Sequence, residues 1–458
     1  MGNKFLFTAA VAFAFAMGSS VAFGQESDGE VISPNAEKIA AVADGTIQEA
    51  LASWWGFDSA DATASLQAAL NSGVEVLHID KQSCPWNVTP LVVPSDIEIV
   101  IDAGVTVQAK EGAFQGINDF LFSVQYQKNV VFRGNGDDSV LLMRKSDYHQ
   151  EPYKKSEWRH GICLRAVKNV RIENLVIRST GGDGIYLGAG KGGAPCEDVT
   201  IKNVFCDDNN RQGISVISAR NLLIEGCVLS NTRGTPPAAG IDFEPNSANE
   251  CLINCVMRDC VMDNNAGDGI ELWLGQLKGG VSEPLSLTFE NCVCRNNDRS
   301  GFFEEFLHHN DKVLQGEITL KNCSFIGNHY PAIRLYSKSP DAHALNLENI
   351  TIDMTGVDKK FAAIAMASTK VKNHPPVHRP VGGMVWDNLT IIVPDGRRPF
   401  AYSDDTKSGF GLFDITGTVT IKHSADEPGE VITIDDNWLA QNFPGVRVAE
   451  NAAENAAE

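Results

Sequence analysis

The amino-acid sequence predicts an all-β fold, a right-handed parallel β-helix in which the chain winds as a solenoid. Two observations support this. Short strands of alternating apolar and polar residues recur roughly every 30 residues, and a turn-forming Asn, Gly or Asp holds one constant place in each repeat. A second short strand, beginning Gly-Ile or a close variant, follows each turn at a nearly fixed distance. Strand repeats of this length without helical periodicity are typical of stacked coils of parallel strands.

The turn residues set the register of the repeats. They are Asn174, Asn203, Gly226, Asp259, Asn291, Asn322 and Asn349. All three residue types tolerate a left-handed backbone, and Asn and Asp also hydrogen-bond locally. The offset from the turn to the Gly-Ile site is 10 residues in five of seven repeats and 14 in the other two. This regularity lets us assign each side chain to the inner or outer face of a coil.

Seven of the 11 cysteines fall at inward positions of the repeat. They are Cys206, Cys227, Cys255, Cys260, Cys292, Cys294 and Cys323. A buried cysteine packs as a small hydrophobe, so we expect these thiols to be reduced. The odd total also excludes a complete disulfide framework, and the pairing of Cys84, Cys163, Cys196 and Cys251 stays open.

The two ends of the chain are predicted to lie outside the solenoid. Residues 1–24 have the features of a signal peptide, with Lys4 before a short apolar run and small residues before the expected cleavage point. They predict a secreted or periplasmic protein. We expect a linker over residues 25–54, the β-helix domain over residues 55–447 and a low-complexity tail over residues 448–458. No apolar stretch is long enough for a transmembrane helix.

Within the domain, residues 61–70 predict a helix that caps the N-terminal end, with Asp61 as N-cap. Weaker coils are expected at residues 130–134, 384–389 and 413–417. The net charge of −20 makes nucleic acid an improbable partner. We predict no metal and no cofactor, with a calcium ion among Asp183, Asp207, Asp208 and Asp242 left open. The oligomeric state is not predicted.

These residues resemble the pectin-lyase-like superfamily, which includes pectate lyases, polygalacturonase-related glycoside hydrolases and mannuronan epimerases. The turn asparagines resemble the asparagine ladder of pectate lyases. Residues 61–70 resemble an Asp-Asp-Thr-x-x-Leu-Gln segment of the polygalacturonase-related group, with Ala62 replacing the second Asp. The resemblance covers roughly residues 55–425. It implies the fold and a carbohydrate ligand, whereas the reaction varies within the superfamily.

Two short segments resemble motifs of specific families in part. Gly182-Asp183-Gly184-Ile185 resembles the Asp-Gly-Ile part of a polygalacturonase motif. The segment from Gly240 to Pro245, Gly-Ile-Asp-Phe-Glu-Pro, resembles a mannuronan epimerase motif but lacks its His. Neither match is complete, so the specific family stays open.

Strand parity selects the residues that face a groove. In Gly-Ile-x-Leu the Ile and Leu point inward, so x and the second residue after it point outward. These positions form two columns: Cys163, Tyr186, Ser215, Asp242, Glu271, Phe303, Arg334 and Ala365, and then Arg165, Gly188, Ile217, Glu244, Trp273, Glu305, Tyr336 and Ala367.

Paired carboxylates in these columns predict acid–base chemistry. Asp242 lies beside Glu271 on the next coil and two residues before Glu244. Carboxylates this close shift apart in pKa, which suits one general acid and one base. Asp183 and Asp268, which precede the glycines, are further catalytic candidates, although Gly-Asp-Gly also suits a plain turn.

Other side chains in or beside the columns are candidates for substrate binding. They are His160, Arg211, Trp273, Tyr186, Arg334, Tyr336 and Glu305. Trp273 and Tyr336 offer flat faces to sugar rings. Arg211 suits an anionic group but could instead pair with Asp207 or Asp208. A lone histidine such as His160 is often structural.

Two insertions are expected to wall the groove. Residues 144–158 contain Arg144, Lys145, Lys154, Lys155, Tyr148, Tyr153 and Trp158, and residues 370–383 contain Lys370, Lys372, His374, His378 and Arg379. Basic and aromatic side chains together favour an anionic polysaccharide.

The sequence therefore predicts a carbohydrate-active enzyme that binds a polysaccharide or oligosaccharide, with a glycoside hydrolase as the first hypothesis. A polysaccharide lyase or uronate epimerase is the alternative. A non-catalytic glycan-binding solenoid is the second.

Overall fold

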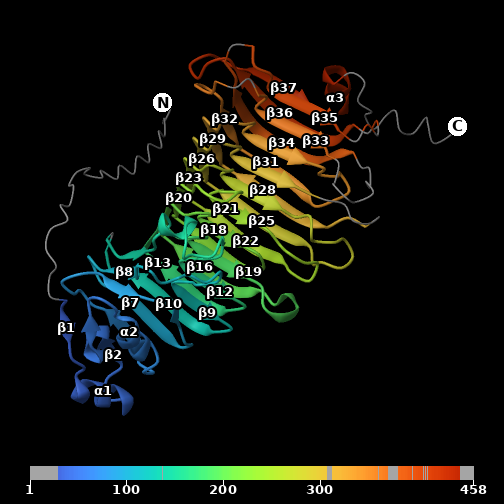
Figure 1. Cartoon of the computed structure of the whole chain (residues 1–458). Coiled ribbons are helices and arrows are strands. Elements are labelled where there is room, and N and C mark those ends of the chain that lie inside the picture. The colour runs from blue at the N-terminus through green and yellow to red at the C-terminus, as the bar shows by residue number, and fades with distance from the viewer. Residues whose placement is uncertain are drawn as a thin grey trace, which may run out of the picture.

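The computed structural model describes residues 29–443 except 137, 307–311, 359–360, 370–379, 395, 406, 408 and 410. The expected signal peptide, the C-terminal tail and the basic residues from Lys370 to Arg379 lie outside these residues. The all-β prediction is confirmed, because two long sheets of stacked, almost entirely parallel strands form the body of the described chain and helices are few. The coils follow one another along a single axis from the N-terminal to the C-terminal end (Figure 1).

The groove-bearing sheet has eleven parallel strands, one from each successive coil. In sequence order they are β6 (Leu91–Val92), β9 (Phe122–Gln125), β12 (Ile162–Arg165), β15 (Ile185–Gly188), β18 (Ile214–Val216), β21 (Ile241–Phe243), β24 (Ile270–Trp273), β27 (Phe302–Glu305), β30 (Ile333–Tyr336), β33 (Ile364–Ser368) and β35 (Phe400–Asp404).

The larger sheet has 24 strands and forms the remaining faces of the solenoid. They are β2 (Glu49–Leu51), β4 (Val76–Ile79), β5 (Trp86–Val88), β7 (Ile97–Ile101), β8 (Thr106–Ala109), β10 (Lys128–Gly134), β11 (Val140–Leu142), β13 (Lys168–Glu173), β14 (Val176–Arg178), β16 (Cys196–Lys202), β17 (Phe205–Asp207), β19 (Ala219–Glu225), β20 (Val228–Ser230), β22 (Leu252–Arg258), β23 (Val261–Asp263), β25 (Leu285–Glu290), β26 (Val293–Arg295), β28 (Gly316–Lys321), β29 (Ser324–Ile326), β31 (Ala344–Glu348), β32 (Thr351–Asp353), β34 (Val381–Ile392), β36 (Leu412–Lys422) and β37 (Glu430–Ile434). The three weaker coils expected from the sequence lie in β10, β34 and β36.

The Gly-Ile-x-Leu pattern produces the predicted parity. Ile185, Ile214 and Ile241 are register partners in neighbouring coils, and all three are fully buried. Each inward side chain packs on the equivalent residue above and below, so the core grows with every coil. The outward residues between them are thereby held in columns at the strand spacing of ~4.8 Å.

The predicted turn residues adopt the left-handed backbone, with φ between 52° and 65°. Their side chains also stack between coils: the Asn322 amide donates to Asn291 Oδ1 at 3.2 Å, and Asn349 donates to Asn322 at 3.2 Å. A second asparagine ladder, which the sequence analysis missed, lies inside the solenoid. Asn265, Asn297 and Asn328 are fully buried and linked through side-chain hydrogen bonds of 2.9–3.0 Å.

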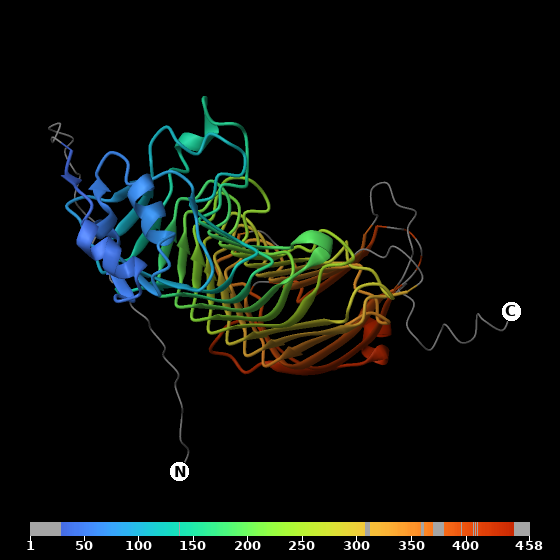
Figure 2. The same cartoon turned by 90° about the horizontal axis from the view of Figure 1, so that it is seen from below.

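Helices cover the N-terminal end of the solenoid, at the blue end of Figure 2. They are α1 (Ala36–Ala43), the 3-10 helix η1 (Ala52–Trp55) and α2 (Thr63–Leu70). The predicted cap helix is present, but it begins at Thr63 with Ala62 as N-cap, so the assignment of Asp61 as N-cap was wrong. Asp61 instead accepts the Thr63 N–H at 3.0 Å. The expected linker over residues 25–54 includes α1, and β2 joins the large sheet.

At the other end, the antiparallel strand β37 pairs with β36, and helix α3 (Asp436–Asn442) packs against both strands. Short β1 (Val31–Ile32) and β3 (Phe57–Asp58) pair at the N-terminal end. The 3-10 helices η2 (Asp147–His149) and η3 (Lys191–Gly193) lie in connections between coils. Within the described residues, no helix has the length and apolar character needed to cross a membrane.

All eleven cysteines are free thiols, which answers the open question about the four outside the ladders. The seven inward cysteines are at most 3% exposed, as predicted. Cys227, Cys260, Cys292 and Cys323 occupy one column, and the Cys227 N–H donates to Cys260 Sγ at 3.3 Å. Hydrogen bonding with the preceding thiol of the column raises the pKa of the Cys292 and Cys323 thiols, and burial raises it further.

Candidate functional site

The two outward columns have the predicted register. Asp242 is the register partner of Ser215 on one side and of Glu271 on the other. Further along, Trp273 pairs with Glu305, and Glu305 pairs with Tyr336. The candidate residues therefore lie on one face of the solenoid, although they divide into two clusters.

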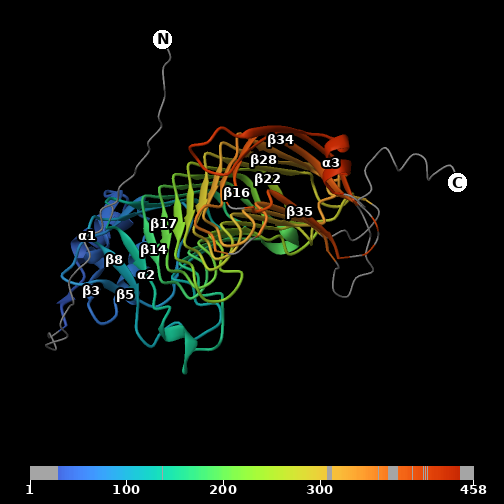
Figure 3. The same cartoon turned by 90° about the horizontal axis from the view of Figure 1, so that it is seen from above.

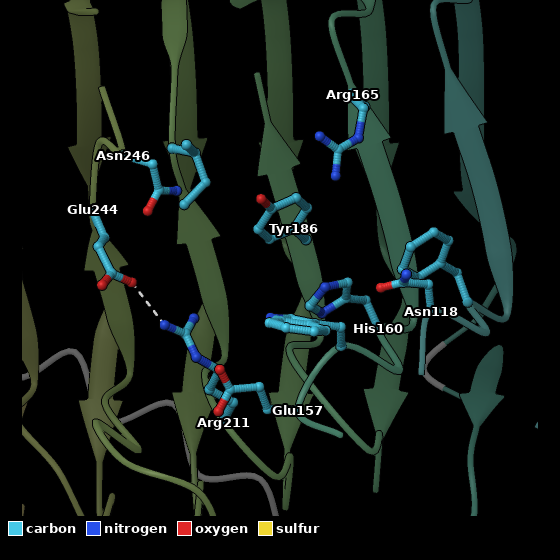
Figure 4. Close-up of a pocket in the computed structure, with 11 residues that line it drawn as sticks. Asn118, Glu157, His160, Arg165, Tyr186, Arg211, Glu244 and Asn246 are labelled. Carbon is cyan, nitrogen blue, oxygen red and sulfur yellow. Dashed lines mark hydrogen bonds and ion pairs between the residues drawn. The ribbon is translucent and has the colours of Figure 1, made fainter. Parts of the chain in front are cut away.

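The first cluster surrounds a cavity of about 420 Å³ over strands β12 to β21. Its lining residues are Asn118, Phe120, Glu157, Trp158, His160, Arg165, Tyr186, Arg211, Ile217, Glu244 and Asn246. Figure 4 shows side chains from several coils converging on this hollow. Four of the predicted site residues line it: His160, Tyr186, Arg211 and Glu244.

Arg211 lies at the centre of the carboxylates in this cluster. Its Nη2 is 2.7 Å from Glu244 Oε2 and 3.9 Å from Asp242 Oδ2, and its Nη1 is 3.8 Å from Asp183 Oδ1. The suggested pairing of Arg211 with Asp207 or Asp208 was wrong. Asp207 instead pairs with Arg178 at 2.9 Å and Asp208 with Lys145 at 2.7 Å.

Asp183 lies beneath the pocket, fully buried, beside His160. Burial raises the pKa of Asp183 to about 7, although Arg211 acts in the opposite direction. His160 Nδ1 accepts the Asp183 main-chain N–H at 3.0 Å and lies 3.2 Å from Asp183 Oδ2. Burial also lowers the pKa of His160 well below 6.5, and Arg211 and Arg165 add to that effect. The imidazole is therefore neutral at pH 7.

His160 belongs to an aromatic stack that forms one wall of the pocket. The rings of His160 and Tyr186 lie 4.6 Å apart and almost parallel, and Phe120 stacks on the other side at 5.5 Å. Burial raises the pKa of Tyr186 to about 12. At neutral pH both rings are uncharged; the faces of His160 are covered by its two neighbours, and Tyr186 offers the pocket its outer face and its hydroxyl group.

Asp242 and Glu271 are also buried, with 1% and 6% exposure. Burial raises the pKa of Asp242 well above its ordinary value, and the neighbouring Glu271 and Glu244 raise it further. Burial and Asp268 raise the pKa of Glu271. Gln212 donates to Asp242 Oδ2 at 3.0 Å. Glu244 is the more accessible carboxylate, with a side-chain exposure of 30%.

The second cluster lies further towards the C-terminal end. Buried Asp268 is held by Arg334, whose Nη2 is 3.1 Å from Oδ2, and by Arg299 at 3.6 Å. The Arg334 guanidinium lies 3.8 Å above the Phe303 ring. Asp268 and Arg334 therefore form a buried ion pair. Trp273, Glu305 and Tyr336 on the same face remain partly exposed.

The first insertion forms part of the pocket wall, and it stands out from the body of the solenoid in Figure 3. Trp158, 46% exposed, lines the pocket. Tyr148 and Tyr153, expected to face the groove, instead pack against each other at 5.2 Å inside the insertion. Arg144 pairs with Asp147 at 2.5 Å. Lys154 and Lys155 are exposed.

The residues described by the structure include no group of three or more His, Cys, Asp or Glu side chains that could hold a metal ion. The calcium hypothesis thus gains no support there, since Asp207 and Asp208 are engaged by Arg178 and Lys145.

Several pocket residues were not proposed as site residues from the sequence. Asn118, Phe120, Glu157 and Asn246 come from connections between coils, where the repeat provides no parity. Arg165 did have a signal, because it occupies the second outward column. It received no role because its neighbours in the pocket were not known.

Comparison with known proteins supports the fold. The family model described as "Right handed beta helix region" matches residues 128–283. The surface protein and adhesin PfbA of Streptococcus pneumoniae superposes with a TM-score of 0.53 at 10% identity, covering 82% of this chain and 96% of the other. The A-module of a mannuronan C-5 epimerase from Azotobacter vinelandii gives a TM-score of 0.50 at 15% identity, with coverages of 79% and 92%.

Two curated relatives match a shorter segment. The SPbeta prophage-derived uncharacterized protein YorA of Bacillus subtilis is 27% identical over 161 residues, which is 33% of this chain and 27% of the relative. The uncharacterized protein YclG of the same organism is 25% identical over 164 residues, 34% of this chain and 27% of the relative. The chain thus spans about a quarter of the length of these relatives. These comparisons show the fold, a right-handed parallel β-helix, and assign no specific family.

Proposed function

We propose that this protein is a carbohydrate-active enzyme that binds a polysaccharide in the pocket over β12–β21 and hydrolyses a glycosidic bond there. The observation that carries the proposal is the arrangement of carboxylates around Arg211. Glu244 reaches the pocket in an ion pair with Arg211 at 2.7 Å, and buried Asp242, whose pKa is raised, lies directly behind it.

Glycoside hydrolysis needs one carboxyl group that donates a proton and a second carboxylate on the other side of the bond. Glu244 and Glu157 are the two carboxylates that line the pocket, and they come from different parts of the chain. Asp242, behind Glu244, stays protonated at neutral pH because burial favours its neutral form, and it can supply a proton to Glu244. In this scheme Asp242 and Asp183 influence the protonation of the pocket residues, and Glu244 contacts the substrate.

The pocket walls suit a sugar ring. The stack of Phe120, His160 and Tyr186 offers apolar faces, and Trp158 adds an indole at the rim. The amides of Asn118 and Asn246 supply donors and acceptors for hydroxyl groups. Small-ligand sites are usually lined by apolar and aromatic side chains together with a few polar groups that orient the ligand.

A lyase or epimerase is the second candidate, and one observation favours it. Tyr186 and neutral His160 lie in contact within the pocket, and the Arg165 guanidinium lies 5.9 Å from the Tyr186 ring. A base beside a cation is what proton abstraction next to a carboxylate requires.

The deciding experiment is to incubate the purified protein with a panel of plant, algal and bacterial polysaccharides. Reducing ends without unsaturated ends would support the hydrolase. Reducing ends together with ultraviolet absorbance of unsaturated ends would identify a lyase. A change in uronate composition without chain cleavage would identify an epimerase, and binding with no product would contradict the enzyme proposal.

A further inference from the structure

Two arginines line the pocket, and they differ in their partners. Arg211 lies within 4 Å of three carboxylates, those of Asp183, Asp242 and Glu244. The Glu244 carboxylate, 2.7 Å away, already pairs with the Arg211 guanidinium. An anionic ligand that approached Arg211 would meet this carboxylate as well, so Arg211 is the less favourable anion-binding group.

Arg165 is the other cation. It ends strand β12, its side chain is partly exposed, and its Nη1 donates to the Ala189 carbonyl at 3.0 Å. Among the described residues, no Asp or Glu carboxylate lies within ion-pair distance of Arg165. Its other contact is with the Tyr186 ring, 5.9 Å from the guanidinium carbon.

This lack of a carboxylate partner is unusual in a chain with a net charge of −20. Most arginines with a described side chain in the coils are paired with Asp or Glu, as Arg133, Arg171, Arg258 and Arg295 illustrate. Arg165 differs from the other arginines without a carboxylate partner in that it lines the pocket, where its partly exposed guanidinium still has donors to offer. Its planar fork matches the oxygen atoms of a carboxylate or a sulfate group.

We propose that the pocket binds a sugar unit carrying an anionic substituent, a carboxylate or a sulfate, and that Arg165 is the residue that recognises it. This inference rests on the proposed function, because it assumes that the pocket is where the polysaccharide binds. It extends that function by naming the substrate class and the residue that selects it.

The layout of the pocket sets the orientation of the ligand. Arg165 and Glu244 lie on opposite sides of Tyr186 in Figure 4. They belong to β12 and to the end of β21, three coils apart, which corresponds to about 14 Å along the axis. The anionic group is therefore held at the Arg165 end and kept away from Glu244. The aromatic stack contacts the sugar ring between them.

The test is affinity electrophoresis of the intact protein in gels containing polygalacturonate, dextran sulfate or neutral dextran. We expect retardation by polygalacturonate or by dextran sulfate, and the two gels distinguish a carboxylate from a sulfate. Neutral dextran should not retard the protein. Arg165→Gln should weaken binding about tenfold or more, because one charge-assisted contact is lost. Arg165→Lys, which keeps the charge, should bind more tightly than Arg165→Gln and less tightly than the wild type.

Arg171→Gln is the matched control. Arg171 is an exposed arginine on β13, paired with Glu173, outside the pocket. Its variant should bind as the wild type does. Melting of Arg165→Gln should be unchanged, since its side chain makes one hydrogen bond to a main-chain carbonyl. Equal binding by Arg165→Gln and wild type, or no retardation in either anionic gel, would overturn the inference.

The outcomes separate this inference from the proposed hydrolase. Arg165-dependent binding without any product would remove the enzyme proposal and leave the recognition of an anionic sugar in place. Hydrolysis of neutral polysaccharides, with no binding in the anionic gels, would support the enzyme and overturn the role of Arg165.

Discussion

Asp242 and Glu271 lie side by side on neighbouring coils, in β21 and β24, and both are almost completely buried. Each is a carboxyl group removed from water next to another acid. Ionising both would place two like charges at the spacing of neighbouring strands. The solenoid therefore favours a state in which at least one of them holds a proton.

This arrangement predicts a stability that falls as the pH rises. The folded-state pKa values of Asp183 and Asp242 lie above their ordinary value of 3.8, and that of Glu271 lies above 4.5. The folded protein thus binds more protons than the unfolded chain once the pH exceeds about 4, and stability is lost as the pH rises through 7. Urea unfolding at pH 5 and pH 8 should show the higher free energy of unfolding at pH 5.

In the variant Glu271→Gln, the difference between the free energies of unfolding at pH 5 and pH 8 should be smaller than in the wild type by on the order of 2 kcal/mol. Glu225→Gln is the control. The side chain of Glu225 is partly exposed, and hydrogen bonds from Lys202 and Arg258 lower its pKa, so its stabilising effect is lost only at acidic pH. That variant should keep the wild-type slope above pH 5. A slope unchanged by Glu271→Gln would mean that the buried acids are ionised in the folded state.

The internal asparagine ladder predicts a strong effect of one substitution. The Asn297 amide donates to the Met262 carbonyl at 3.2 Å and to Asn328 at 2.9 Å, and its Oδ1 accepts from the Asn265 main chain at 3.1 Å. Asn297→Ala should lower the free energy of unfolding by ~3 kcal/mol, because it leaves buried groups without partners. Chemical denaturation measures it.

Asn322→Ala is the matched comparison for the outer ladder. Its side chain is exposed and hydrogen-bonds to Asn291 and Asn349. Water can replace those bonds, although the left-handed backbone of Asn322 disfavours alanine. We expect a loss of ~1 kcal/mol, with no change in groove chemistry. An Asn297→Ala variant as stable as Asn322→Ala would contradict the inner ladder's role.

The buried thiols give a third prediction. Thiol titration should find few reactive groups in the native protein and close to eleven in denaturant, since all eleven cysteines are free. Burial raises the pKa of Cys206 and Cys255, and the other ladder cysteines are buried too, so none reacts readily while folded. Finding most thiols paired after unfolding without reductant would refute the reduced ladders.

The coil register was predictable from the sequence because a strand repeats every two residues and the turn-to-glycine offset is nearly constant. Glu304 occupies the inward Leu position of the Gly-Ile-x-Leu pattern, although no role was predicted for it. The structure shows it fully buried and paired with His343 at 2.7 Å. The inner ladder also had a signal, since Asn264-Asn265 and Asn296-Asn297 recur one coil apart.

The pocket was not predictable in the same way. Asn118, Phe120 and Asn246 come from connections that have no repeat, so parity says nothing about where they point. Strand parity also predicted that Asp242 points towards the groove, but it could not predict that the side chain is buried there. Its burial depends on Arg211, Gln212 and Glu271, which approach from neighbouring coils.

The last prediction concerns turnover. Asp242→Asn keeps the shape and the Gln212 contact but removes the titrating proton behind Glu244. We expect the fold to survive and turnover on a confirmed substrate to fall about 100-fold, which is the usual scale for an acid–base group. Glu244→Gln, which removes the accessible carboxylate, should lower turnover by at least the same factor. Thermal melting and circular dichroism check that both variants fold.

The variants Asp183→Asn and Arg211→Ala test which coil holds the group that transfers the proton. Asp183 lies beside His160, two coils nearer the N-terminal end than Asp242. If Asp183→Asn and Arg211→Ala abolish turnover while Asp242→Asn does not, the proton is held at the Asp183–His160 pair. The lyase or epimerase then gains over the hydrolase, because Tyr186 and Arg165 are the neighbours of that pair. If none of these variants changes a confirmed activity, the reaction takes place outside this pocket.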